Sequence, residues 1–155
     1  MLTSWLHLLA LTVYLGAVIG LWVMLIPCVR RVAPQETQLK LLAQGLKLYN
    51  PLQVGALGIV VLTGAFAITD LKANYRGLFA QQLGGTLAIK LALSFFLIIL
   101  STYQAMGIAH RFVRRFEADE SLPLRDIEAI THRLRALSIA ILLLAAPIVW
   151  LGIRL

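Results

Sequence analysis

The stretch TLAIKLALSFFLIILSTYQAMGIA, residues 86–109, has one charged side chain, Lys90, among its 24 residues. A helix of about 20 mainly apolar residues is long enough to cross the hydrocarbon core of a bilayer. Three other stretches have the same character, so we expect spans at about residues 2–26, 51–69, 86–109 and 137–153. The fold class predicted from this pattern is all-α, an integral membrane four-helix bundle.

The composition supports a membrane protein over a soluble one. The chain is 60% hydrophobic and 14% charged, whereas soluble domains average about 45–50% apolar and roughly 25% charged residues. A soluble fold of 155 residues could not bury so much apolar surface. We therefore expect residues 1–155 to form a single transmembrane domain with the lipid bilayer as its partner. The single cysteine, Cys28, excludes an intrachain disulfide.

Prolines are expected to mark two span boundaries. Pro27 should end the first span, because proline has no backbone N–H and its ring clashes with the preceding helical turn. Pro51 follows the capping residue Asn50 and should begin the second span. No Lys or Arg precedes the first apolar run, so we expect a span here and not a typical cleavable signal peptide.

Both long loops are expected to contain amphipathic helical extensions. Residues 35–49 carry leucines at helical spacing, and residues 121–136 carry isoleucines and leucines in the same way. The Ser-Leu-Pro sequence at 121–123 is typical of a helix start. The fourth helix is therefore expected to begin outside the membrane and to continue into it.

The distribution of Lys and Arg predicts the orientation. Residues 29–49 hold four of them and residues 110–136 hold six, which together make ten of the 14 in the chain. The opposite side has three: Lys72, Arg76 and Arg154. Cytoplasmic loops carry the excess of basic residues, so we expect both termini outside and a location in the cell inner (plasma) membrane. Because the net charge of +7 lies between apolar runs, it does not indicate nucleic acid binding.

Three ionisable residues, His7, Asp70 and Lys90, lie in or at the edge of apolar spans. Such residues are costly in hydrocarbon and are candidates for function. The predicted orientation puts all three toward the outer face. The alternatives are that Lys90 extends to the headgroups, that Asp70 is interfacial, and that His7 only hydrogen-bonds a neighbour.

Polar residues also share helix faces. On the third span, four lie within about 80° of one another at 100° per residue: Lys90, Ser94, Ser101 and Gln104. On the first span, His7 and Tyr14 share a face. Polar stripes should face protein or a cavity, so His7, Tyr14 and Ser94 join Lys90 and Asp70 as candidate ligand-binding residues. Hydrogen bonding between helices is the alternative.

A second candidate group, near the inner face, consists of Met24, Cys28, Met106 and His110. Sulfur ligands combined with imidazole suit Cu(I), so the group is an alternative metal site. Methionine is also ordinary apolar filling in such helices.

Glycines on the first two spans are expected to serve helix packing. Gly16 and Gly20 form a G-x-x-x-G pattern, and Gly55 and Gly58 thin one side of the second span. Small residues allow membrane helices to approach closely. We expect contacts within the bundle here, with a face for a second copy as the alternative.

Four short segments resemble a known family. WLHLL at residues 5–9 and YLG at 14–16 are similar to the opening of the CopD-like copper-resistance membrane domain, although Tyr stands where Trp is usual. VLTG at residues 61–64 resembles that family's second helix, and LAIKLAL at 87–93 resembles its third.

The resemblance implies a CopD-like membrane protein that holds a redox-active ligand, haem b or copper, in the outer half of the bundle. His7 would be the metal ligand, and Lys90 would pair with a haem propionate or with Asp70. The same layout resembles, more weakly, HemJ, a membrane protoporphyrinogen oxidase associated with haem b, in which His7 and Lys90 would be the functional residues. Whether the chain is an enzyme stays open. A cofactor-free subunit of a larger membrane complex, or of a homo-oligomer, is a further alternative.

The orientation can be tested by labelling single cysteines in a Cys28→Ser chain. Gln38→Cys is expected to react only from the cytoplasmic side and Asn74→Cys only from the outside, because basic loops stay in the cytoplasm. A membrane-impermeant maleimide applied to intact cells and to inverted vesicles measures this. Labelling of both positions from the same side would refute the four-span topology.

Overall fold

The computed structural model describes residues 2–74 and 84–154, and the side chains within 3–69 and 84–153. All the regular elements in this part of the chain are helical, which confirms the predicted all-α class. Two of them, marked η, are π-helical. In chain order the elements are α1 (Leu2–Gly20), η1 (Leu21–Leu25), α2 (Ile26–Arg31), α3 (Gln35–Asn74), α4 (Gly84–Thr102), η3 (Tyr103–His110), α5 (Arg111–Glu117) and α6 (Leu124–Arg154).

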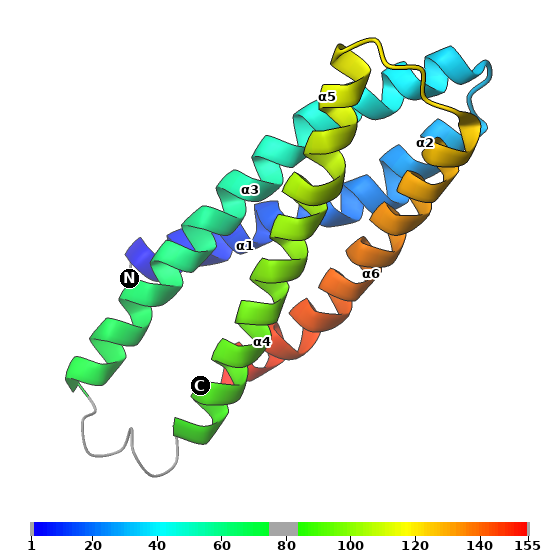
Figure 1. The fold of residues 1–155 in the computed structure, drawn as a ribbon. Coiled ribbons are helices and arrows are strands. Elements are labelled where there is room, and N and C mark those ends of the chain that lie inside the picture. Colours follow the sequence, from blue (N-terminus) through cyan, green and yellow to red (C-terminus); the bar gives the residue numbers. More distant parts are fainter. Residues whose placement is uncertain (1, 75–83, 155) are drawn as a thin grey trace.

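These elements make four long rods (Figure 1), because α1, η1 and α2 follow one another without a break, as do α4, η3 and α5. Each rod includes a helix long and apolar enough to cross a membrane, and the chain is a membrane protein. The connectors at residues 32–34 and 118–123 lie at the same end of the bundle, which we call the connector end. We call the opposite end, where α1 begins and α6 ends, the terminal end.

The expected proline boundaries were wrong. The first rod continues past Pro27 to Arg31, and Pro51 lies inside α3, 16 residues after its start at Gln35. A π-helical segment immediately precedes Pro27, and the N–H of Ile26 bonds to the Leu21 carbonyl five residues earlier. Such local adjustments satisfy backbone groups that a proline frees, so a single proline need not end a membrane helix.

The helical extensions are present as expected. Residues 35–49 belong to α3, and α6 begins at Leu124, directly after the Ser-Leu-Pro sequence, and continues through Pro147. The third rod also runs further than the expected end at residue 109, reaching Glu117. The rods are therefore longer than the spans they contain, and they pack against one another beyond the predicted membrane boundary.

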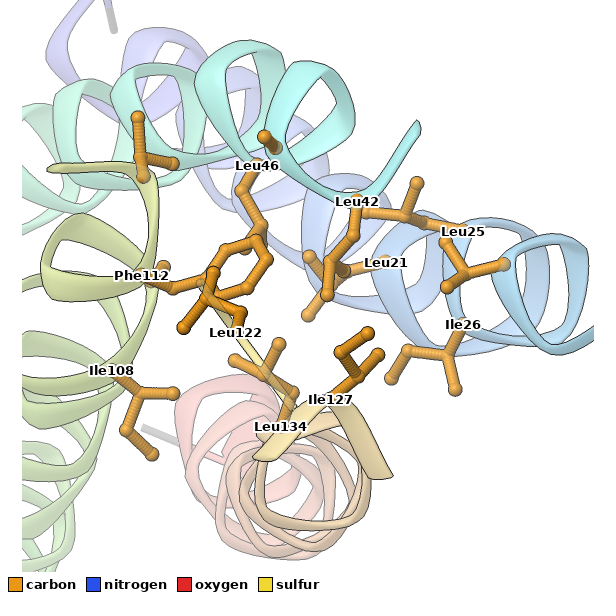
Figure 2. Packing of buried hydrophobic residues seen from close by; sticks show 14 residues of the cluster. Leu21, Leu25, Ile26, Leu42, Leu46, Ile108, Phe112, Leu122, Ile127 and Leu134 are labelled. Carbon is orange, nitrogen blue, oxygen red and sulfur yellow. The ribbon is translucent and has the colours of Figure 1, made fainter. Parts of the chain in front are cut away.

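The largest buried cluster lies at the connector end (Figure 2), and we call it the connector cluster. It brings together Leu21, Leu42, Phe112 and Leu134 from all four rods. Leu122, from the connector before α6, closes it and is 5% exposed. Because the helical extensions supply part of this cluster, burial there removes apolar side chains from water, and this stabilises the fold in the ordinary hydrophobic way.

Packing thins toward the terminal end. A smaller cluster around Tyr14, Val18 and Ile141 fills the middle of the bundle. Beyond it, in residues 3–13, 58–69, 84–96 and 146–153, the buried side chains are few: Ala10, Thr63 and Leu87. The helices there pair mainly as α1 with α3 and α4 with α6. The large exposed apolar side chains of this end are suited to contact lipid or a bound group.

Glycine contacts differ from those expected. Gly16, Gly55 and Gly58 have no other part of the protein within 4 Å of the position that a Cβ would occupy, so they do not mediate packing within the bundle. Gly20 does, because its Cβ would lie 3.0 Å from a Tyr49 ring atom. Gly45, which the sequence did not single out, lies tightest against a neighbour: its Cβ would overlap the Leu25 side chain.

Gly45→Ala is expected to lower stability relative to Gly16→Ala by about 1–3 kcal/mol, the usual cost of overpacking a core. Leu25 is only 7% exposed and cannot move away freely. Both substitutions gain about the same helix propensity, roughly 0.8–1.0 kcal/mol, so the difference isolates the clash. Thermal unfolding in detergent measures it. Equal midpoints for the two variants would contradict the close approach of the first rod to α3.

Candidate functional site

His7 is half-buried on α1 and bonds to α3. Its Nδ1 lies 2.7 Å from Thr63 Oγ1, and Thr63 is 5% exposed. The Thr63 hydroxyl donates its single proton to the carbonyls of Ile59 at 2.7 Å and Val60 at 3.1 Å. With that proton directed to a carbonyl, Thr63 accepts from His7 Nδ1–H, and in this tautomer the lone pair lies on Nε2. The backbone of Val60 also hydrogen-bonds the His7 ring.

The segment that holds His7 is the VLTG stretch at residues 61–64. Thr63 supplies the hydrogen bond, and a Cβ on Gly64 would lie 3.6 Å from His7 Cε1. Two segments that carry the family resemblance, WLHLL and VLTG, are thus in contact. In the sequence Thr63 stands out only as part of that motif, because a hydroxyl on another helix leaves no local signal beside the histidine.

Lys90 is half-buried on α4 and reaches α6. Its Nζ lies 3.2 Å from the position that a Cβ on Gly152 would occupy, so the missing side chain leaves room for the ammonium group. Lys90 also lies within Coulombic range of the His7 imidazole. Among the side chains of residues 3–69 and 84–153, no carboxylate forms an ion pair with Lys90. Asp70 lies in α3, and its side chain is outside the described ones.

Tyr14 and Ser94 have different surroundings from His7. Tyr14 is 1% exposed and shares a buried hydrogen bond with Ser101, linking α1 to α4. This bond occupies its hydroxyl in the middle cluster. Ser94 is half-buried, and within the described part of the chain it makes no side-chain hydrogen bond. His7 and Lys90 thus lie within Coulombic range of each other, whereas Tyr14 serves helix packing.

The side chains of the second candidate group, Met24, Cys28, Met106 and His110, are all exposed. The inward faces of the same helices carry the connector cluster instead. A metal site needs donors that converge, and among the described side chains no group of three or more His, Cys, Asp or Glu residues could hold a metal ion.

A buried amide network crosses the centre of the bundle. Gln104, expected on the inward stripe, is 2% exposed and donates to Ser138 Oγ at 2.9 Å. It accepts from Gln53 at 3.2 Å, and Asn50 donates to the carbonyl of Ala105, also at 3.2 Å. These bonds join α3, η3 and α6. Amide and hydroxyl groups do not titrate near neutrality, so the network can position helices but offers no acid or base.

A cavity of about 440 Å³ lies at the connector end, between the first rod and α6, and Trp22 is part of its lining. Trp22 follows His7 by 15 residues, which is about 22 Å along a helix axis. The cavity is therefore separate from the His7 site.

Comparisons with models of protein families, with curated proteins and with solved structures gave no match. The fold and the site together define a four-span helical membrane protein with a half-buried imidazole and a half-buried ammonium group near its terminal end. The resemblance to the CopD-like and HemJ families remains a prediction from the quoted segments.

The interior position of Ser101 can be tested with its neighbour as control. Ser101 is 2% exposed against Tyr14, whereas Thr102 is exposed. Ser101→Leu should destabilise the protein by about 1–3 kcal/mol through overpacking, and Thr102→Leu should be neutral. Thermal unfolding in detergent compares them. If Ser101→Leu were as stable as Thr102→Leu, the inward stripe of α4 would be wrong.

Proposed function

We propose that this protein is a CopD-like protein of the cell inner membrane that binds haem b through His7 and Lys90 in the outer half of the bundle. Both termini would lie outside, because the connector end carries most of the basic residues. The observation that carries the proposal is the hydrogen bond between His7 Nδ1 and Thr63. In the tautomer with the proton on Nδ1, Nε2 would be the atom that binds iron.

The donor set favours haem over copper. A copper ion needs several converging side chains, and among the described residues no three His, Cys, Asp or Glu side chains form such a group. Haem brings four nitrogens of its own, so the protein need supply only an axial ligand, most often a histidine. His7 fits that role, and haem would supply one-electron redox chemistry at this position in the membrane.

Thr63 would orient the iron ligand. A metal-binding histidine almost always donates its other ring N–H to a carbonyl, a carboxylate or water, and this bond fixes the tautomer and the ring plane. Here the Thr63 hydroxyl would be the acceptor, and it donates its own proton to the Ile59 carbonyl. The residue that supports the ligand thus lies on α3, while the ligand itself lies on α1.

Lys90 would hold an anionic group of the same ligand. A half-buried ammonium group is costly in hydrocarbon unless an anion neutralises it, and the described side chains form no ion pair with it. A haem propionate is an anion attached to the molecule whose iron His7 would bind. The thin packing of the terminal end leaves apolar surface available to a porphyrin ring.

His7→Ala is expected to abolish haem binding, because it removes the only axial ligand proposed. The absorption spectrum and the haem-to-protein ratio of protein purified with haem supplied measure this. His132→Ala is the matched control, since His132 is an exposed imidazole on α6. Full occupancy in His7→Ala would show that His7 is not the ligand.

Three further variants test the supporting hydrogen bond and the charge. Thr63→Val keeps the shape and should weaken haem binding by about 10–100-fold, the usual effect of losing a ligand's hydrogen-bond partner. Lys90→Ala should also weaken it, and Lys90→Arg should restore part of the loss.

A wild-type protein that stays colourless and metal-free with haem and copper supplied would favour a cofactor-free subunit. Porphyrinogen oxidation by the pure protein would favour a HemJ-like oxidase.

A further inference from the structure

The cavity at the connector end is built from two kinds of side chain. Three arginines line it: Arg30 and Arg31 at the end of α2, and Arg135 on α6. The rest of the lining is apolar and includes Trp22 and Val23. Its volume of about 440 Å³ is within the range of small-molecule sites, roughly 300–1,000 Å³.

The positive charge of this cavity is not neutralised within the described part of the chain. The ion pairs formed there involve Lys47 and Arg115, and none includes Arg30, Arg31 or Arg135. All three arginines are exposed. Two helices that are separate in sequence, α2 and α6, thus contribute arginines to the lining of one cavity, and this arrangement suits an anion.

The expected position of the cavity along the membrane normal favours a lipid over a soluble anion. Arg30 and Arg31 are the first basic residues after the apolar first span, and Arg135 directly precedes the apolar run that begins at Leu137. In the predicted topology the arginines lie at headgroup level, and Val23, 55% exposed, lies about two helical turns further into the span. In a phospholipid the phosphate likewise lies at headgroup level and the acyl chains lie deeper in the membrane.

We propose that this cavity binds the headgroup of an anionic phospholipid. The planar guanidinium groups bind phosphate oxygens in pairs, while Trp22 and Val23 contact the upper acyl chain. Basic pockets between membrane helices on the cytoplasmic side are suited to such headgroups. Because three arginines line the cavity, a headgroup with two phosphates, as in cardiolipin, binds more tightly than phosphatidylglycerol.

The fluorescence of Trp22, which lines the cavity, measures lipid contact there directly. In a Trp5→Phe, Trp150→Phe chain Trp22 is the remaining tryptophan, and brominated lipids quench tryptophan fluorescence on contact. The protein is reconstituted in phosphatidylcholine vesicles containing equal mole fractions of brominated phosphatidylglycerol or brominated phosphatidylcholine. Stronger quenching by the brominated anionic lipid is expected, and unbrominated cardiolipin should reverse it at lower mole fraction than unbrominated phosphatidylglycerol. Equal quenching by the two brominated lipids would overturn the proposal.

Arginine variants separate a built site from general attraction. Arg30→Gln, Arg31→Gln and Arg135→Gln together should remove the preference for the anionic lipid, and each alone should lower it about fivefold, since a basic residue near the surface contributes about 1 kcal/mol. The control removes three exposed basic residues outside the cavity, Lys40, Arg125 and Arg133. An equal loss in the control would mean non-specific attraction and would overturn the proposal.

Inorganic phosphate distinguishes a lipid site from a soluble-anion site. Millimolar phosphate should leave the quenching by brominated phosphatidylglycerol unchanged, because free phosphate lacks the acyl chain contacts. Reversal of the quenching by phosphate would assign the cavity to a soluble anion and overturn the lipid proposal. None of these outcomes depends on haem, so the result stands apart from the function proposed for His7.

Discussion

The bilayer requires every backbone N–H and C=O within it to find a partner in the protein. The structure follows from this constraint. It accounts for four long helices, for the continuation of the first rod past Pro27, and for the π-helical segment before that proline. In water a helix can end at a proline, because water hydrogen-bonds the backbone groups that are left unpaired. In hydrocarbon those groups stay paired only if the turn adjusts and the helix continues.

The same constraint changes what holds the helices together. Apolar side chains gain nothing by leaving lipid for one another, so packing within the span depends on close contact and on hydrogen bonds. The Tyr14–Ser101 bond, the Gln104 network and the His7–Thr63 bond each join different helices. Only at the connector end, where the helices extend beyond the predicted spans, does the hydrophobic effect act in the usual way.

The two ends of the bundle are therefore built differently. The terminal end is thinly packed and carries a half-buried imidazole bonded to Thr63 and a half-buried ammonium group. The connector end is densely packed, and beside its core three arginines line a cavity. His7 and the cavity residue Trp22 are separated along the first rod by about four helical turns, roughly 22 Å.

The sequence by itself determined the helical class, the approximate spans, the basic loops and the inward position of Ser101 and Gln104. Hydropathy and helical periodicity are local properties, and the bilayer acts on each segment separately. Only the tertiary structure decided that Thr63 hydrogen-bonds His7 and that Gly45, not Gly16, lies against a neighbouring helix. It also decided that Arg135 lines the same cavity as Arg30 and Arg31. Such partners depend on how each helix is rotated and paired, which no single segment encodes.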